Sequence, residues 1–395
     1  MITNYEPTFA PRRSPLRRLV ARDSAVWRLD WILLTSVLLL CGIGSLLVWS
    51  ATRTQLLNSG ADPQAMFHRQ LLNIAIGAAL AVCAGAFDYR VLRAYTPVLY
   101  IAACFALVAV LSPLGATING SHSWIVLGGG FQFQPSELAK LALVVGFAML
   151  LSEVRDGETR PRSADVIRAL ALAVVPMLLI MLQPDLGTTL VFGVVILGML
   201  AVSGAHKRWI FGLVLGVALA AFLAIHFGLL AQYQMQRFEA FLNPMADPRG
   251  IGYNANQARI AVGSGGIFGK GLFQGQQTNG QFVPEQHTDF IFTVAGEELG
   301  FVGCAAIVVL FGLVLWRALR IAARAEDRYG TLVATGITCW FAFQAFENIG
   351  MDLGIMPITG LPLPFLSYGG SSMFATLIAV GLLMNIRLRT SRFDT

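Results

Sequence analysis

Long apolar stretches recur along this 395-residue chain, and they constrain its fold more than any other feature. An α-helix needs about 20 consecutive apolar residues to cross a bilayer. Hydrophobic residues make up 56% of the chain and charged residues only 13%, which is too little polar surface for a soluble protein. The sequence therefore predicts an all-α polytopic membrane protein with about ten transmembrane helices. The predicted spans are 30–51, 70–88, 94–113, 135–152, 166–182, 185–204, 209–230, 289–316, 329–350 and 367–387.

The basic residues alternate along these spans. They cluster before the first span, after the last one and in every second loop, which by the positive-inside rule puts both termini in the cytoplasm. The net charge of +6 thus reports topology, and no nucleic-acid partner is expected. We expect a multi-pass membrane protein surrounded by membrane lipids. The basic loops contain Arg90 and Arg93, Arg155 to Arg168, Lys207 and Arg208, and Arg317 to Arg328.

Two parts are predicted. Residues 1–29 form a basic cytoplasmic tail, and residues 30–390 form the transmembrane domain. That domain includes a large extracytoplasmic loop, 231–288, between the seventh and eighth helices, with short amphipathic pieces around 233–242 and 254–262. The five cysteines lie in apolar spans, so we interpret them as small core residues.

Asp289 lies where the eighth span begins, at the predicted boundary between water and hydrocarbon. An ionisable side chain is costly there and usually has a function. The alternative is a helix cap, because Asp accepts hydrogen bonds from the free N–H groups of a first turn. His287, two residues earlier, is interpreted either as a site residue or as part of the loop.

Four spans that run inward begin with polar residues. On this topology each points its N-terminus, the positive end of its macrodipole, at the outer face. Several such ends together form an anion-binding site, although proline and serine at these positions are also ordinary capping choices. The four starts are Gln134–Lys140, Gln183–Thr189, Asp289 and Ser367–Ser372.

Cationic side chains near these starts could bind phosphate. Glu137 and Lys140 are three residues apart, so they share a helix face and can pair; Lys140 could bind a phosphate or only neutralise a carboxylate. Arg259 and Lys270 flank the segment Gly263–Gly271, whose glycines let backbone N–H groups approach a ligand.

Burial is expected to raise the pKa of Asp289, which suits a general base acting on a sugar hydroxyl. Nearby cations and helix N-termini would stabilise a departing diphosphate. Both requirements meet in glycosyl transfer from a lipid diphosphate. Four further carboxylates receive no assigned chemistry: Glu297, Glu298, Glu347 and Asp352.

These motifs, in this order, resemble the SEDS family of cell-wall proteins, which includes RodA, FtsW and SpoVE. The glycine-rich segment resembles RodA more than FtsW. The matching segments are Gln134–Lys140, Gln183–Thr188, Gly263–Gly271, Pro284–Phe292, Glu297–Gly300 and Pro362–Ser371.

The resemblance implies a ten-helix peptidoglycan glycosyltransferase that polymerises lipid II at the outer face of the bacterial cytoplasmic membrane, beside a class B penicillin-binding protein. It places the family's essential aspartate at Asp289, and further site residues at Glu137, Lys140 and Asp185. Ser367 is assigned to substrate binding with them. Many relatives carry Gly-Ala-Arg-Arg-Trp where this chain has Gly120-Ser121-His122-Ser123-Trp124, so both arginines are missing. Trp124 is interpreted as a substrate contact or as an interfacial aromatic.

Our hypothesis is that Asp289 activates the acceptor hydroxyl while Lys140, Arg259 and Lys270 hold the diphosphate. No cofactor is required by the sequence, and no ligand cluster demands a metal, although a divalent cation could assist the leaving group. The product would serve cell elongation, as for RodA, or division. The alternatives are a lipid II flippase or other secondary transporter, whose broken helices and intramembrane charges look similar, and a non-catalytic scaffold.

Overall fold

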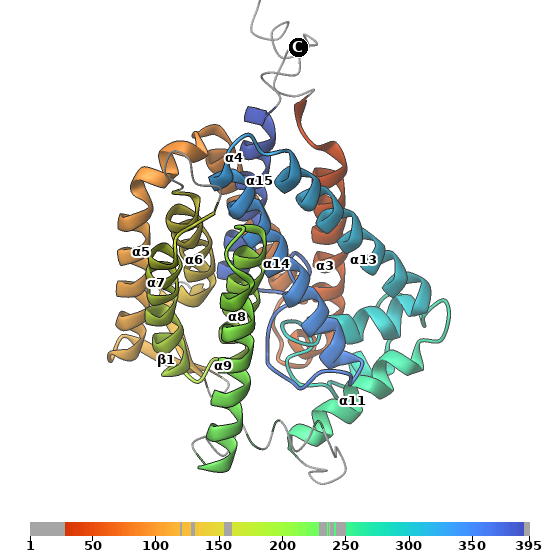
Figure 1. The fold of residues 1–395 in the computed structure, drawn as a ribbon. Coiled ribbons are helices and arrows are strands. Elements are labelled where there is room, and N and C mark those ends of the chain that lie inside the picture. Colours follow the sequence, from red (N-terminus) through yellow and green to blue (C-terminus); the bar gives the residue numbers. More distant parts are fainter. Residues whose placement is uncertain are drawn as a thin grey trace, which may run out of the picture.

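In the part of the chain that the structure describes, ten long helices form a bundle. The computed structural model describes residues 28–118, 121–127, 131–153, 160–228, 235, 237, 241 and 250–390. The ten helices coincide with the ten predicted spans (Figure 1). They are α3 (Trp31–Asn58), α4 (Ala65–Ala86), α5 (Tyr89–Leu111), α6 (Pro135–Ser152), α7 (Ser163–Met181), α8 (Leu186–Val202), α9 (Lys207–His226), α13 (Ile291–Arg324), α14 (Arg328–Asp352) and α15 (Gly370–Thr390).

Within the described part of the chain, eight of these helices are long and apolar enough to cross a membrane. The other two are α8, which has 17 residues, and α14, which turns several polar side chains into the bundle. The protein is therefore a multi-pass membrane protein. Residues 1–27 of the predicted basic tail, with most of the predicted piece at 233–242, lie outside the described residues.

Arginine–aspartate pairs join the helices at one end of the bundle, which we call the basic end. Asp30 caps α3 by accepting from Leu33 N at 3.1 Å, and it also accepts from Arg317 Nε at 2.8 Å and from Arg317 Nη2 at 2.6 Å. At the same end, Arg389 Nη1 of α15 lies 3.0 Å from the carboxylate of Asp88, the cap of α5. The basic residues thus do more than report topology, because they link the ends of neighbouring helices.

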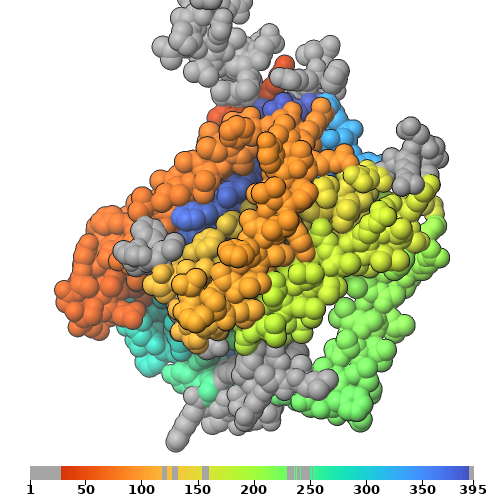
Figure 2. Space-filling view, turned by 90° about the vertical axis from the view of Figure 1, so that its left-hand side faces the viewer, coloured from red at the N-terminus to blue at the C-terminus, as the bar shows by residue number. Residues whose placement is uncertain are grey.

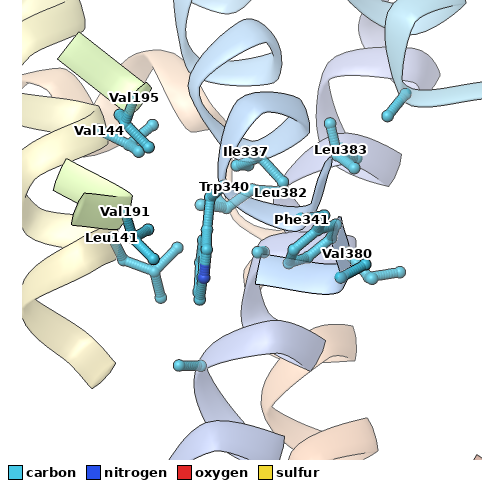
Figure 3. Packing of buried hydrophobic residues seen from close by; sticks show 14 of the residues in the cluster. Leu141, Val144, Val191, Val195, Ile337, Trp340, Phe341, Val380, Leu382 and Leu383 are labelled. Atoms are coloured by element: carbon cyan, nitrogen blue, oxygen red, sulfur yellow. The ribbon is translucent and has the colours of Figure 1, made fainter. Parts of the chain in front are cut away.

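Helix α14 forms the centre of the core. Trp340 and Phe341 are both fully buried, and Figure 3 shows Trp340 directed towards Leu141 and Val191 while Phe341 lies on the side of Val380. Lipid is as apolar as a protein core, so close packing rather than removal from water holds membrane helices together. Gly336 serves this packing, because a Cβ there would come within 2.9 Å of Val144 and 2.8 Å of Met199.

The outer helices expose apolar side chains. In Figure 2, α4 and α5 cover much of one face, and part of α15 is visible between them. Helix α9 has no buried residue and lies at the edge of the bundle against α8. Its exposed side chains include Phe211, Leu215 and Phe222. Such a surface is suited to contact with lipid chains.

The end opposite the basic end carries short elements between the helices, and we call it the site end. A three-stranded antiparallel sheet, which the sequence did not predict, joins α5 to α6. Its strands are β1 (Gly115–Ile118), β2 (Ser121–Leu127) and β3 (Phe131–Phe133), with Ala116 opposite Trp124. Helices α11 (Ile251–Ser264) and α12 (Gln276–Asn279) lie in the long loop, and α11 covers the predicted piece at 254–262.

Helix α13 is broken at Gly300, and the loop 265–271 is inserted into the break. The freed N–H of Phe301 donates to Gly266 O at 2.9 Å, while Lys270 N donates to Glu297 O at 3.0 Å. Gly300 has a φ of 66°, and a Cβ there would lie 2.2 Å from Gly269 N. Only glycine allows the two backbones to come this close.

Candidate active site

Four helix starts converge at the site end, as the sequence predicted. Gln134 N, at the start of α6, donates to Ser371 Oγ of α15 at 2.9 Å. Tyr368 N, just before α15, donates at 2.9 Å to the carbonyl of His287, close to the start of α13. Side chains beside the start of α6 reach Asp185, the N-cap of α8, at 3.5 Å. The positive ends of these macrodipoles therefore face a common region.

Asp289 lies in this region, at the end of a tight turn. The carbonyl of Glu285 accepts from the N–H groups of Thr288 and Asp289, both at 3.1 Å, which places Asp289 two residues before α13. Helix α13 begins without a side-chain cap. The capping alternative is therefore not what the structure shows, and the half-buried Asp289 carboxylate is left for another role.

Asn348 of α14 holds the backbone at Asp289. Its Nδ2 donates to Asp289 O at 2.6 Å and to Leu361 O at 2.7 Å, joining the start of α13 to the loop between α14 and α15. Asp289 Oδ2 lies 3.2 Å from the position that a Cβ on Gly360 would occupy. Glycine at 360 thus keeps the space beside the carboxylate open.

The pKa of Asp289 is raised to about 8. Desolvation is the largest cause, and the negative charges of Glu285, Glu347 and Asp185 add to it, while Arg237 opposes them. A carboxyl group with this pKa can both accept and release a proton near neutral pH. The expectation of a raised pKa is confirmed.

Glu137 and Lys140 form a fully buried pair inside the bundle, 2.6 Å apart. Lys140 also donates to Gln344 Oε1 at 3.1 Å, and Gln344 Nε2 donates to Pro362 O at 2.7 Å. The pair is therefore linked through Gln344 to the loop beside Asp289. Its predicted contact with substrate stays a prediction.

Asp185 makes the local bonds of the capping alternative, whereas Ser367 accepts from a residue that precedes it and caps no helix start. Asp185 accepts from Thr188 N at 2.9 Å and from Thr188 Oγ1 at 2.8 Å. Ser367 Oγ accepts from Leu363 N at 2.7 Å. Asp185 also acts electrostatically on Asp289, so capping and a place in the site are compatible here.

The two cationic side chains predicted in the long loop, Lys270 and Arg259, have different surroundings. Lys270 Nζ is paired with Glu297 Oε1 at 2.8 Å and bonds Ser264 Oγ at 3.0 Å. Arg259 is exposed on α11, bonds Asn256 and lies against Gly354, just after α14. Arg259 is the freer of the two to meet a ligand, and the role of Lys270 in substrate binding stays a prediction.

Trp124 and His122 lie on β2 of the sheet. His122 Nδ1 is 2.9 Å from Thr117 Oγ1, so its ring is tied to the neighbouring strand. Trp124 is half-buried, and none of the described contacts brings it to Asp289. Both interpretations of Trp124 stay open.

His287 is packed rather than solvated. Its ring centroid is 5.7 Å from that of Tyr368, and burial lowers its pKa while Glu285 opposes the shift. A neutral imidazole beside Asp289 adds no positive charge to the site.

Sequence reasoning missed several site residues. Arg237, Gln344 and Asn348 were not singled out, and Glu347 was noted without a role. A signal existed, because Gln344, Glu347 and Asn348 follow helical spacing and therefore share one face of an otherwise apolar helix. A polar face within a membrane span usually turns towards the bundle interior.

No group of three or more His, Cys, Asp or Glu side chains that could hold a metal occurs among the residues the structure describes. Assistance by a divalent cation stays a prediction.

The fold and the site define a multi-pass helical membrane protein with a carboxylate-centred site where four helix starts meet. The chain belongs to the FtsW/RodA/SpoVE family of cell cycle proteins, which it matches over residues 30–392.

Sequence similarity to curated relatives extends over nearly the whole chain. Stage V sporulation protein E of Bacillus subtilis is 41% identical over 365 residues, covering 92% of this chain and 98% of the relative. Peptidoglycan glycosyltransferase MrdB of Escherichia coli is 40% identical over 362 residues, covering 91% of this chain and 93% of the relative.

Solved structures share the fold. A chain from a peptidoglycan synthase complex described as coordinating polymerization and crosslinking has a TM-score of 0.75 and 31% identity, covering 92% of this chain and 99% of that one. Rod shape determining protein RodA of Thermus thermophilus has a TM-score of 0.67 and 31% identity, with 93% and 98% covered.

Proposed function

We propose that this protein is a peptidoglycan glycosyltransferase that polymerises lipid II into glycan strands, with Asp289 as its general base. The observation that carries the proposal is the placement of Asp289, which caps no helix, has a pKa raised to about 8 and lies at the convergence of four helix starts. The names of its relatives, which include peptidoglycan glycosyltransferases, support the same activity.

In the proposed step, the acceptor sugar's 4-hydroxyl attacks the donor's anomeric carbon. A new C–O bond forms, the bond to the lipid diphosphate breaks, and the hydroxyl proton passes to Asp289. The diphosphate leaves with the electron pair, and a single displacement inverts the carbon. Helix N-termini and nearby cations would stabilise the developing charge.

The geometry favours different roles for the cationic side chains: some would bind the diphosphate and others would hold the loops. The positive charge of Arg237 acts on Asp289, and the Arg237 side chain donates to Thr359 O at 3.0 Å. Arg259 is exposed nearby, on α11. These two are our candidates for the diphosphate. Lys140 and Lys270 already have carboxylate partners 2.6 Å and 2.8 Å away, which supports a role in holding the loops.

The remaining assignments follow from this activity. Lipid II presents its sugars outside the cell, so we place the site end outside and both termini in the cytoplasm, with the basic end beside the inner leaflet. Residues 30–390 act as one transmembrane domain. The partner would be a class B penicillin-binding protein, consistent with the solved peptidoglycan synthase complex, and the strands would serve cell elongation or division.

The test uses the purified full chain in vesicles with labelled lipid II, with and without candidate partners, and resolves the products on a gel. Wild type should form a ladder of glycan chains, and Asp289→Asn should not. Asp62→Asn changes an exposed carboxylate between α3 and α4 and is the matched control. A ladder from the Asp289→Asn protein would overturn the assignment of the base. No ladder from wild type with any partner, together with lipid II crossing the membrane, would favour the transporter.

A further inference from the structure

Gln286 is a buried residue three positions before Asp289, and the proposed mechanism gives it no role. Only 3% of its surface is exposed, so its side chain does not meet a substrate. Its Nε2 donates to Thr278 O at 2.9 Å and to Ala51 O at 3.2 Å. The first carbonyl belongs to α12 in the long loop and the second to α3. One amide therefore attaches the segment before Asp289 to two other parts of the fold.

This segment, residues 285–289, forms a strained turn that we call the Asp289 turn. Glu285 has a φ of 51°, in the left-handed region that residues other than glycine rarely adopt. Its carbonyl accepts from Thr288 N, from Asp289 N and from Thr288 Oγ1, each at 3.1 Å. Such a backbone persists only where its surroundings fix it, and strained residues of this kind cluster at active sites. Gln286, the next residue, supplies a fixed point.

The acceptor of Gln286 on the long loop is itself held in place by Glu297, a fully buried residue of α13. Glu297 Oε2 accepts from Thr278 N at 2.8 Å and from Thr278 Oγ1 at 2.9 Å. Its Oε1 accepts from Gln277 N at 2.9 Å and from Lys270 Nζ at 2.8 Å. Hydrogen bonds to a charged group are stronger than those between neutral groups. The Thr278 carbonyl is therefore a fixed attachment point for the Asp289 turn.

Asp289 is thus held on two sides. From α14, Asn348 Nδ2 donates to its carbonyl at 2.6 Å. From the other side, Gln286 attaches the turn to α3 and to the long loop. Because the backbone is fixed before and at Asp289, the direction of its side chain is fixed as well.

We propose that Gln286 is a positioning residue, which places the Asp289 carboxylate for proton transfer by fixing the Asp289 turn. This inference rests on the proposed function. A catalytic group displaced by about 1 Å can lose roughly a hundredfold in rate. Gln286 itself touches no substrate and exchanges no proton.

Gln281 offers a matched comparison, because its Nε2 donates to the same two carbonyls. It lies 3.0 Å from Ala51 O and 3.4 Å from Thr278 O. Gln281 is outside the Asp289 turn. Replacing either glutamine leaves each carbonyl with the other as its donor, so no buried acceptor is orphaned. Any difference in activity between the two variants therefore reflects the place of the residue in the chain.

The experiment measures kcat and KM for glycan polymerisation, per folded protein, with the full chain in vesicles. Gln286→Met should lower kcat by roughly tenfold or more, because the base is misplaced, and should leave KM within about twofold of wild type. Gln281→Met should leave both constants near those of wild type. Gln286→Asn keeps an amide donor on a shorter side chain, so its kcat should lie between those of Gln286→Met and wild type. It also serves as the test if Gln286→Met does not fold.

Equal kcat values in Gln286→Met and Gln281→Met would overturn the proposal, as would a change confined to KM. Hydrogen exchange of the backbone amides gives a second readout, which needs no activity and detects local opening. Residues 285–290 should exchange faster in Gln286→Met than in wild type, and at the wild-type rate in Gln281→Met. Unchanged exchange in Gln286→Met would also overturn the proposal. If wild type forms no chains but exchange responds as expected, the proposed function fails and the attachment of the Asp289 turn by Gln286 stands.

Discussion

The side chain of Asn348 donates a hydrogen bond of 2.6 Å to the backbone carbonyl of Asp289. These two residues are 59 positions apart in the sequence, and the bond attaches the start of α13 to the last turns of α14. The same nitrogen also holds Leu361 O at 2.7 Å. One amide thus sets the position of the candidate base relative to the loop that faces it.

Replacing Asn348 with Leu should reduce polymerisation by roughly 10- to 100-fold, because catalytic groups displaced by about 1 Å lose rates of this order. Two buried carbonyls would also lose their donor, at a cost of about 1–3 kcal/mol each. The measurement is kcat per folded protein, with thermal stability recorded in parallel.

Asn385→Leu is the matched control. Asn385 is also buried and donates to the backbone carbonyls of Ala84 and Gly85, but at the basic end. It should destabilise the protein without lowering the activity of the folded fraction. Equal activity losses in both variants would contradict a specific role for Asn348.

The thermal stability of wild type should depend on the titration of Asp289. Its pKa of about 8 in the folded protein lies above the value of about 3.9 expected when unfolded, so folding favours the protonated form. Its contribution to stability is therefore fully present below about pH 4 and is lost as the pH rises through about 8.

Asp289→Asn stays neutral, so its melting temperature should exceed that of wild type most clearly above pH 8. Thermal unfolding in detergent across a pH series measures this difference. A difference that does not vary with pH would contradict the raised pKa.

The buried pair of Glu137 and Lys140 should behave as a unit. Lys140→Met alone leaves a buried carboxylate without its partner, which costs about 3–5 kcal/mol. Changing Glu137→Gln as well removes the orphaned charge and should recover most of the loss. A double-mutant cycle on thermal stability measures the coupling, and simple additivity would refute it.

Gly300→Ala should expel the inserted loop from the break in α13. The new Cβ would lie 2.2 Å from Gly269 N, and alanine disfavours the φ of 66°. Limited proteolysis should then cut within 264–280 faster than in wild type. Gly312→Ala, in the same helix with no atom within 4 Å of the new Cβ, should leave the cleavage rate unchanged.

Much of the fold could be predicted because membrane helices leave a local signature. The ten apolar spans matched ten helices, since each span satisfies its own backbone hydrogen bonds within a continuous segment. The sheet of β1 to β3 was not predicted, because its strands of 4, 7 and 3 residues are too short to show a clear alternation.

The candidate site could be predicted only in part. Asp289 stood out because a carboxylate beside an apolar run is visible locally. The partners of Lys140 and Lys270 were not visible in this way. Gln344 lies 204 positions from Lys140, and Glu297 lies 27 positions from Lys270, so only folding reveals that these lysines are paired.

The sequence by itself determined the class of protein, the number of spans and the position of the candidate base, because hydropathy and capping chemistry are properties of neighbouring residues. Tertiary structure alone decided which charges surround Asp289. Electrostatic interactions depend on distance in space and on burial, and the residues concerned, Asp185, Arg237 and Glu347, come from separate segments that only packing brings together.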